Sequence, residues 1–270
     1  SMLAILDHRP MKAFVCVYRH SNPSPSEWKN TLTAASANPR LQQFMNGYTL
    51  PSSYFDWGDD PGFFAASQIF GNPSRSSWGV CRHDVRTQLH PGDFVIWFCA
   101  RSLPDRSGYW GYYFVGCTTV AETIDRFQLW SHPPYRPYQD FYNTLARPHN
   151  GTLIQHETFH PYHSDWQHRA SAPYVLFDGC PSLSAVNLTD PTLVATGTAG
   201  ASEVWLSTQN PRVAQIEATI FTGLRITRRL RTTNPFQPHR HIALHKAPAV
   251  YPSARVPFLS KLRTAVLSLV

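Results

Sequence analysis

The sequence predicts an α+β protein, in which a small curved β-barrel carries flanking helices and a basic C-terminal extension. Two apolar and aromatic runs, 94–100 and 109–120, are separated by a polar turn and indicate a central β-hairpin. Segments with helical periodicity lie on both sides of this hairpin, at 26–37, 211–221 and 257–270. Strands in the middle with helices towards the ends are typical of the mixed class.

The rest of the chain is predicted to alternate short elements with long loops. Residues 46–79 are rich in Gly, Pro, Ser, Asp and aromatic residues, and residues 126–172 in His, Pro, Tyr and Trp. Irregular stretches of this length in a folded domain are usually functional loops. Shorter elements are predicted as a strand at 13–18, a turn or short helix at 84–89, a strand at 174–177, a turn-like stretch at 187–202 and a half-exposed strand at 226–230.

Bulk composition limits the class of protein. The chain has 270 residues, of which 42% are hydrophobic, so it can bury a substantial core. Its sequence contains no apolar run of the ~20 residues that a membrane-spanning helix needs, and no signal peptide is visible. The five cysteines are odd in number and form no Cys-x-x-Cys pair, as is usual for reduced thiols. We therefore expect a cytoplasmic protein with no membrane partner.

Positive charge is concentrated at the C-terminal end. Residues 206–270 contain ten Lys or Arg and one acidic residue, a net charge of +9, whereas the whole chain carries +7 and the rest therefore −2. Such segregation attracts polyanions, and the forked guanidinium group suits phosphate oxygens. The predicted phosphate-binding residues are Arg225, Arg228, Arg229, Arg231 and Arg240. The alternatives are a solvated basic surface or a patch for an acidic partner protein.

A second group of residues is predicted to form a pocket for a nucleic-acid base. Flat aromatic rings can stack on a base, carboxylates can accept hydrogen bonds from its N–H edge, and glycines allow close backbone approach. The candidates are Tyr54, Phe55, Asp56, Trp57, Asp59, Asp60, Trp78 and Trp97. The alternative is that Trp57 and Trp78 anchor the core while the acidic residues belong to a solvated turn.

Two patterns bear on metal chemistry. Asp56, Asp59 and Asp60, together with a histidine, could hold a divalent cation for phosphodiester cleavage. His156 and His160 are spaced as zinc ligands on one helix face, but Pro161 would break that helix and the spacing is not that of His-Glu-x-x-His. A polar loop is therefore favoured there, and the sequence predicts no cofactor and identifies no catalytic residue. Phosphate-binding, dinucleotide and hydrolase-elbow motifs are absent from the sequence.

Around the central hairpin the sequence resembles the PUA-like superfold, which includes the EVE, YTH and ASCH domains and the nucleotide-modification-associated domains. The motifs that carry the resemblance are WGVCR at 78–82, VR at 85–86, PGDFVIWF at 91–98, GYYFVG at 111–116 and the stretch 169–178. The resemblance covers residues 11–180 and implies a barrel that reads modified bases or nucleotides. Residues 181–270 form a basic part with no counterpart in those domains, expected to pack on the barrel in the same structural unit.

The favoured function is therefore a nucleic-acid-binding module, with DNA preferred to RNA, that recognises a base, expected to be a modified one. The aromatic pocket would supply selectivity and the C-terminal arginines phosphate affinity. The resemblance places such a module in defence or DNA-modification systems. The alternative is a metal-dependent nuclease or a nucleotide- or base-modifying enzyme that uses Asp56, Asp59 or Asp60 with a histidine. A third possibility is a module whose basic face binds an acidic protein.

Overall fold

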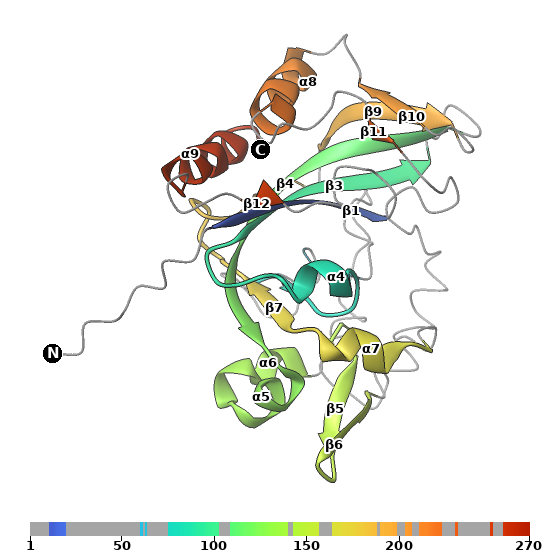
Figure 1. Ribbon diagram of the computed structural model, residues 1–270, viewed down its shortest axis with the longest axis vertical. Helices are drawn as coiled ribbons and strands as arrows, with labels where there is room; N and C mark the ends of the chain where they lie inside the picture. The colour runs from blue at the N-terminus through green and yellow to red at the C-terminus, as the bar shows by residue number, and fades with distance from the viewer. Residues whose placement is uncertain are drawn as a thin grey trace, which may run out of the picture.

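A computed structural model shows a mixed α/β chain built on one large, curved sheet (Figure 1). The structure describes residues 11–19, 60–61, 63, 75–102, 109–139, 143–156, 164–187, 190–198, 203–206, 211–222, 230–231, 249–250 and 256–270. The predicted helix at 26–37 lies outside these residues. The mixed class predicted from the sequence is confirmed.

The sheet is organised by β4 (Tyr109–Ile124), a strand of 16 residues. Its residues 110–119 pair with β3 (Phe94–Ser102) on one side, 109–114 pair with β9 (Thr192–Thr198) on the other, and 120–124 pair with β7 (Tyr174–Phe177). The register shifts at each of these pairings, and such irregularities bend a strand and increase its twist. One continuous strand therefore belongs to two differently directed parts of the sheet.

The complete strand order is β11-β10-β9-β4-β3-β1-β12, with β7 and then β2 added along the second half of β4. The remaining bounds are β1 (Lys12–Arg19), β2 (Ser77–Trp78), β8 (Ala185–Val186), β10 (Glu203–Leu206), β11 (Leu230–Arg231) and β12 (Ala249–Val250). β1 runs parallel to β3, and β8 pairs with the middle of β4.

The prediction of a barrel is corrected by this topology, because the described strands form a curved sheet that does not close. Among the described residues, the outermost strands β11, β12 and β2 contribute two residues each, and none of them pairs with another to complete the ring of strands that a barrel requires.

Most of the long predicted strands and helices are present. The hairpin of β3 and β4, the strands β1 and β7, and the C-terminal helix α9 (Val256–Leu267) lie where the pattern places them. The helix predicted over 211–221 is α8 (Pro211–Ile216), continued by a π-helical segment, η2 (Glu217–Thr222). The prediction for 84–89 corresponds to the short helix α4 (His83–Arg86).

Two segments are more regular than their composition predicts. The stretch predicted to be turn-like, 187–202, contains β9, because the edge of β4 supplies partners to its Thr- and Gly-rich backbone. The predicted loop 126–172 contains six short elements: α5 (Arg126–Ser131), η1 (Pro133–Tyr135), α6 (Arg136–Gln139), β5 (Ala146–His149), β6 (Thr152–Gln155) and α7 (Trp166–Ser171). Each is at most six residues long, too short for a visible hydrophobic period.

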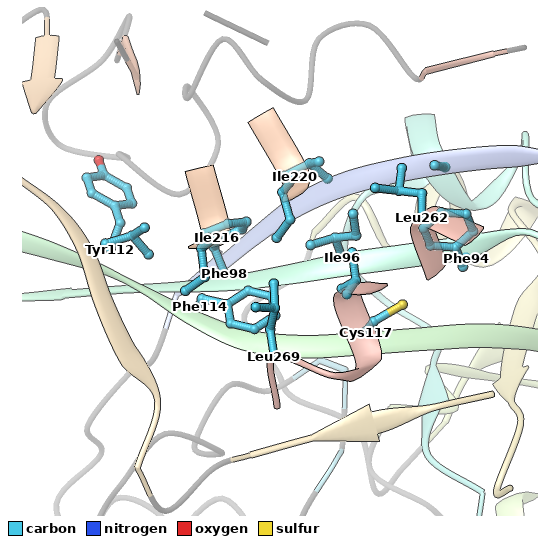
Figure 2. Packing of buried hydrophobic residues seen from close by; sticks show 14 of the residues in the cluster. Phe94, Ile96, Phe98, Tyr112, Phe114, Cys117, Ile216, Ile220, Leu262 and Leu269 are labelled. Carbon is cyan, nitrogen blue, oxygen red and sulfur yellow. The ribbon is translucent and has the colours of Figure 1, made fainter. Parts of the chain in front are cut away.

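Hydrophobic cores lie on both faces of the central strands. One face is covered by α8, η2 and α9, and Figure 2 shows Ile216, Ile220 and Leu262 pointing towards Ile96 and Phe114 of the sheet. The opposite face carries a core rich in aromatic residues that includes Trp78, Trp97, Val115 and Phe177. This second core contains two of the residues predicted to form the pocket, Trp78 and Trp97.

Candidate functional site

A buried carboxylate connects the end of the predicted pocket segment to the turn after β2. Asp60 accepts hydrogen bonds from the main-chain N–H groups of Gly79 (2.8 Å), Val80 (2.7 Å) and Cys81 (2.6 Å). The side-chain amide of Asn143 donates a fourth, at 3.0 Å. Burial raises the pKa of Asp60 to about 6, while Arg86 and the three amides act in the opposite direction, so this carboxyl group is ionised at neutral pH. Asp60 therefore holds residues 79–81 in place.

Arg86, on α4, is buried in the same region and uses its whole guanidinium group on main-chain carbonyls. Its five hydrogen bonds end on Val80, Cys81, Arg169, Ala172 and Pro173, at 2.6 to 3.2 Å. Burial lowers its pKa to about 10, which leaves it protonated at neutral pH. Because α4 follows β2 directly while residues 169–173 come from the α7 region, this one side chain joins two distant segments.

A second buried arginine, Arg126, lies at the start of α5. It donates to the carbonyl groups of Thr144 (2.9 Å), Ala172 (3.0 Å) and Gly79 (2.5 Å), and its guanidinium carbon lies 5.2 Å from the centre of the Tyr174 ring. Burial lowers its pKa to about 9, so it too is protonated at neutral pH. Two guanidinium groups and one carboxylate therefore give this part of the interior a positive charge.

Gly79 is required at the centre of this cluster by close packing. A Cβ atom at this position would lie 2.1 Å from the main-chain oxygen of Asn143 and 2.6 Å from the Tyr174 ring. The hydroxyl group of Tyr174 donates to the Asn143 side-chain oxygen at 2.7 Å, so the same two residues form a wall against the glycine. The backbone next to Trp78 is consequently held by Asp60, Arg126, Asn143 and Tyr174.

Four aromatic rings pack next to this polar cluster. Trp78 and Trp97 meet edge to face with centroids 4.8 Å apart, Phe63 lies 5.4 Å from Trp97, and Phe177 lies 6.0 Å from Trp97 and 6.3 Å from Trp78. Both tryptophan side chains are 1% exposed. The Trp97 Nε1–H donates to Thr118 Oγ1 at 2.6 Å, whereas the Trp78 Nε1–H has no hydrogen-bond partner in the described part of the chain.

The structure therefore brings together three of the predicted pocket residues, Asp60, Trp78 and Trp97, from three separate segments. Both Asp60 oxygens accept hydrogen bonds from donors of the protein itself, and the two indole rings are buried in the core. The other five candidates lie outside the described residues: Tyr54, Phe55, Asp56, Trp57 and Asp59.

Sequence reasoning missed Arg86, Arg126 and Asn143. An arginine in a polar stretch such as residues 82–88 usually lies on the surface, and nothing in its local pattern indicates burial. Arg86 belongs to the Val85-Arg86 motif of the family resemblance, which is the one signal in the sequence that singles it out. Their burial depends on carbonyl groups from residues far away in the chain, which a local pattern cannot show.

The remaining candidates are placed only in part. Arg231 lies in β11, opposite Glu203 of β10, while Arg225, Arg228, Arg229 and Arg240 lie outside the described residues.

The histidine candidates are also placed only in part. His156 is buried and stacks on Trp130 with centroids 5.3 Å apart, and its main-chain N–H donates to Leu145, so it is packed against the β5–β6 region. His160 lies outside the described residues. Within the described ranges, no three His, Cys, Asp or Glu side chains gather in a group that could hold a metal ion.

Comparison with known proteins identifies no family for this chain. No family model matches it, and neither does a curated protein or a solved structure. The resemblance to PUA-like domains accordingly remains a prediction from the sequence motifs. Among the helices in the described part of the chain, none is long and apolar enough to cross a membrane.

Proposed function

We propose that this chain binds nucleic acid, DNA in preference to RNA, and recognises a base, expected to be a modified one, at the aromatic cluster of Trp78 and Trp97. The main support is the Trp78 Nε1–H, which is buried without an acceptor in the described part of the chain, although its neighbour Trp97 is satisfied. An unpaired buried N–H costs about 1–3 kcal/mol. A ligand that supplies an acceptor removes this cost.

A nucleobase has the chemistry that this environment requires. Its exocyclic carbonyl oxygens and ring nitrogens are hydrogen-bond acceptors at the edge of a flat ring. Because the faces of Trp78 and Trp97 are covered and the Trp78 Nε1 atom is itself buried, binding would require the side chains over this edge to move. The base would then be recognised through the indole N–H and not by stacking between the two tryptophans.

The phosphate backbone would be bound by the basic C-terminal part. Its net charge of +9 over residues 206–270 would contribute affinity that does not depend on sequence and that weakens with salt. Selectivity and general affinity would then depend on different residues. The two can be separated by measuring binding to matched duplexes at two salt concentrations.

A Trp78→Phe substitution tests the role of the indole N–H. It keeps an aromatic side chain but removes the donor, so we expect roughly two- to tenfold weaker binding to the preferred modified duplex, the size of one hydrogen bond. Binding to the unmodified duplex should hardly change. The measurement is fluorescence polarisation with duplexes carrying unmodified, methylated, hydroxymethylated or deazaguanine bases.

The matched control is Trp97→Phe, which removes an indole N–H that already has a partner in Thr118. It should lower the thermal midpoint of unfolding but leave the ratio of modified to unmodified binding unchanged. If both variants lose selectivity equally, the role assigned to the Trp78 donor is wrong. If the wild-type chain binds all duplexes equally, recognition of a base is wrong.

A further inference from the structure

The strands β5 and β6 form a two-stranded ribbon that projects from the body of the protein. Figure 1 shows it as an antiparallel hairpin whose tip extends at the end of the molecule opposite α8 and α9. The turn residues Asn150 and Gly151 both have positive φ angles, 49° and 78°, as the tight Asn-Gly turn of a twisted hairpin requires. The ribbon is therefore a defined element with an exposed tip.

One face of the ribbon is committed to packing inside the protein. Leu153 packs in a small core with Val80, Leu145 and Ala170, and the main-chain oxygen of Ala146 accepts a hydrogen bond of 3.0 Å from Trp130 Nε1. Side chains alternate between the faces of a strand, so the register assigns Ala146, Pro148, Leu153 and Gln155 to this face. The base of the ribbon is thus fixed by two neighbouring elements.

The opposite face and the tip have the chemistry of a surface that reads nucleic acid. The register places Arg147, His149, Thr152 and Ile154 together on that face, and residues 149–152 are all exposed. The sequence of the ribbon, 146–155, contains one arginine and no carboxylate. Its tip carries imidazole, amide and hydroxyl groups, the types that donate to or accept from base edges and phosphates. Without a ligand, the Thr152 hydroxyl donates to the His149 carbonyl at 3.0 Å and the Asn150 amide lies 3.4 Å from His149 Nε2.

We infer that the β5–β6 hairpin enters the major groove of duplex DNA. This groove is about 12 Å wide and admits a two-stranded ribbon, whereas the deep, narrow major groove of an RNA helix does not. The sequence of the ribbon contains no carboxylate, so no negative side chain of the ribbon would be repelled by the phosphates that line the groove. The inference rests on the proposed function, because it names the element that contacts the DNA outside the base-recognition cluster.

The test uses a matched pair of substitutions at the exposed tip. His149→Glu introduces a negative charge facing the phosphates, and His149→Gln keeps a neutral polar side chain of similar size. We expect His149→Glu to weaken binding to an unmodified duplex about tenfold relative to His149→Gln, with the difference shrinking as salt increases. In addition, Arg147→Gln should reduce the slope of log K against log salt by about 0.9, the contribution of one phosphate contact.

Chemical interference then identifies the groove. Methylation of guanine N7, a major-groove atom, should reduce binding of the wild-type chain. His149→Glu should bind the N7-methylated and unmethylated duplexes with equal affinity. Equal affinities of His149→Glu and His149→Gln, with normal wild-type binding, would overturn the hairpin inference and leave the proposed function intact. A wild-type chain that binds no duplex at low salt would overturn both. If His149→Glu weakens binding to an RNA duplex or to polyglutamate more than it weakens binding to DNA, the ribbon belongs to another partner.

Discussion

Asp60 and Arg86 bind opposite kinds of main-chain group in the turn after β2. The carboxylate collects N–H groups from the turn after β2, and the guanidinium collects carbonyl groups from that turn and from residues 169–173. Buried main-chain groups that lie outside a helix or sheet need such partners. The two side chains therefore stabilise an irregular backbone next to Trp78, which is where we place base recognition.

Replacing Asp60 by Asn is expected to lower the free energy of unfolding by about 2–4 kcal/mol. In the wild type, an Asp60 oxygen accepts from the main-chain N–H groups of Val80 and Cys81. In the variant, the side-chain NH₂ of Asn would face these N–H groups and leave buried donors unpaired. Urea denaturation followed by circular dichroism measures the change. Asp84→Asn is the matched control, because Asp84 is exposed and pairs with Arg82 at the surface, so its loss should cost less than about 1 kcal/mol. Equal losses in the two variants would show that Asp60 is not a special anchor.

At the scale of elements, the short helices α4 and α7 meet through two imidazole rings. His83 and His168 stack with centroids 4.0 Å apart, and the His83 Nε2 lies 3.1 Å from Ser171 Oγ. Burial, then the proximity of His168 and Arg86, lowers the pKa of His83, against an opposing effect of Asp84. The neutral form is thus the one that the folded state favours.

Because of the contact between His83 and His168, we expect the protein to lose stability in mild acid. Because the folded-state pKa of His83 lies below its unfolded value of 6.5, its contribution is present above pH 6.5 and is lost as the pH falls through the folded-state pKa. The thermal midpoint of the wild-type protein should therefore fall between about pH 7.5 and pH 5. In His168→Gln the fall should be smaller, because one of the charges that repel a protonated His83 is gone.

The control for this experiment is His149→Gln, which removes an exposed histidine that lies outside the α4–α7 contact. Its pH dependence should match that of the wild type. A His168→Gln curve that runs parallel to the wild-type curve would contradict the role of the α4–α7 contact.

At the scale of the whole molecule, the sheet is covered on its outer face by segments that come last in the chain. Leu259, Leu262 and Val266 of α9 are buried against residues of β1, β3 and β4. The strands β9 and β10 extend the same sheet beyond β4. Helices of the C-terminal part are therefore combined with the N-terminal strands in one hydrophobic core.

A substitution in α9 tests this coverage. Leu259→Ala should lower the free energy of unfolding by about 2–5 kcal/mol, the range for a large buried side chain cut to Ala. Lys261→Ala, two positions further along the same helix and exposed, should change it by less than about 0.5 kcal/mol. Both are measured by urea denaturation. A small effect of Leu259→Ala would mean that α9 adds little to the core.

The sequence by itself determined the strongly patterned elements. The apolar runs of β3 and β4 predict their hairpin, and the spacing of apolar residues predicts α9, because both signals are local and long enough to show a period. It also brought Asp60, Trp78 and Trp97 into one candidate group. These predictions need only the preferences of neighbouring residues.

Other features depend on tertiary packing: whether the described strands close, and which groups the described candidate residues contact. The outermost strands in the described part of the chain do not pair with one another, and β9 is a strand because β4 offers it partners. Asp60 is an anchor, and Arg86 and Arg126 are buried, because main-chain groups distant in sequence converge on them. Hydrogen-bond satisfaction in a low-dielectric interior depends on all of these partners at once, so it cannot be read from any one segment.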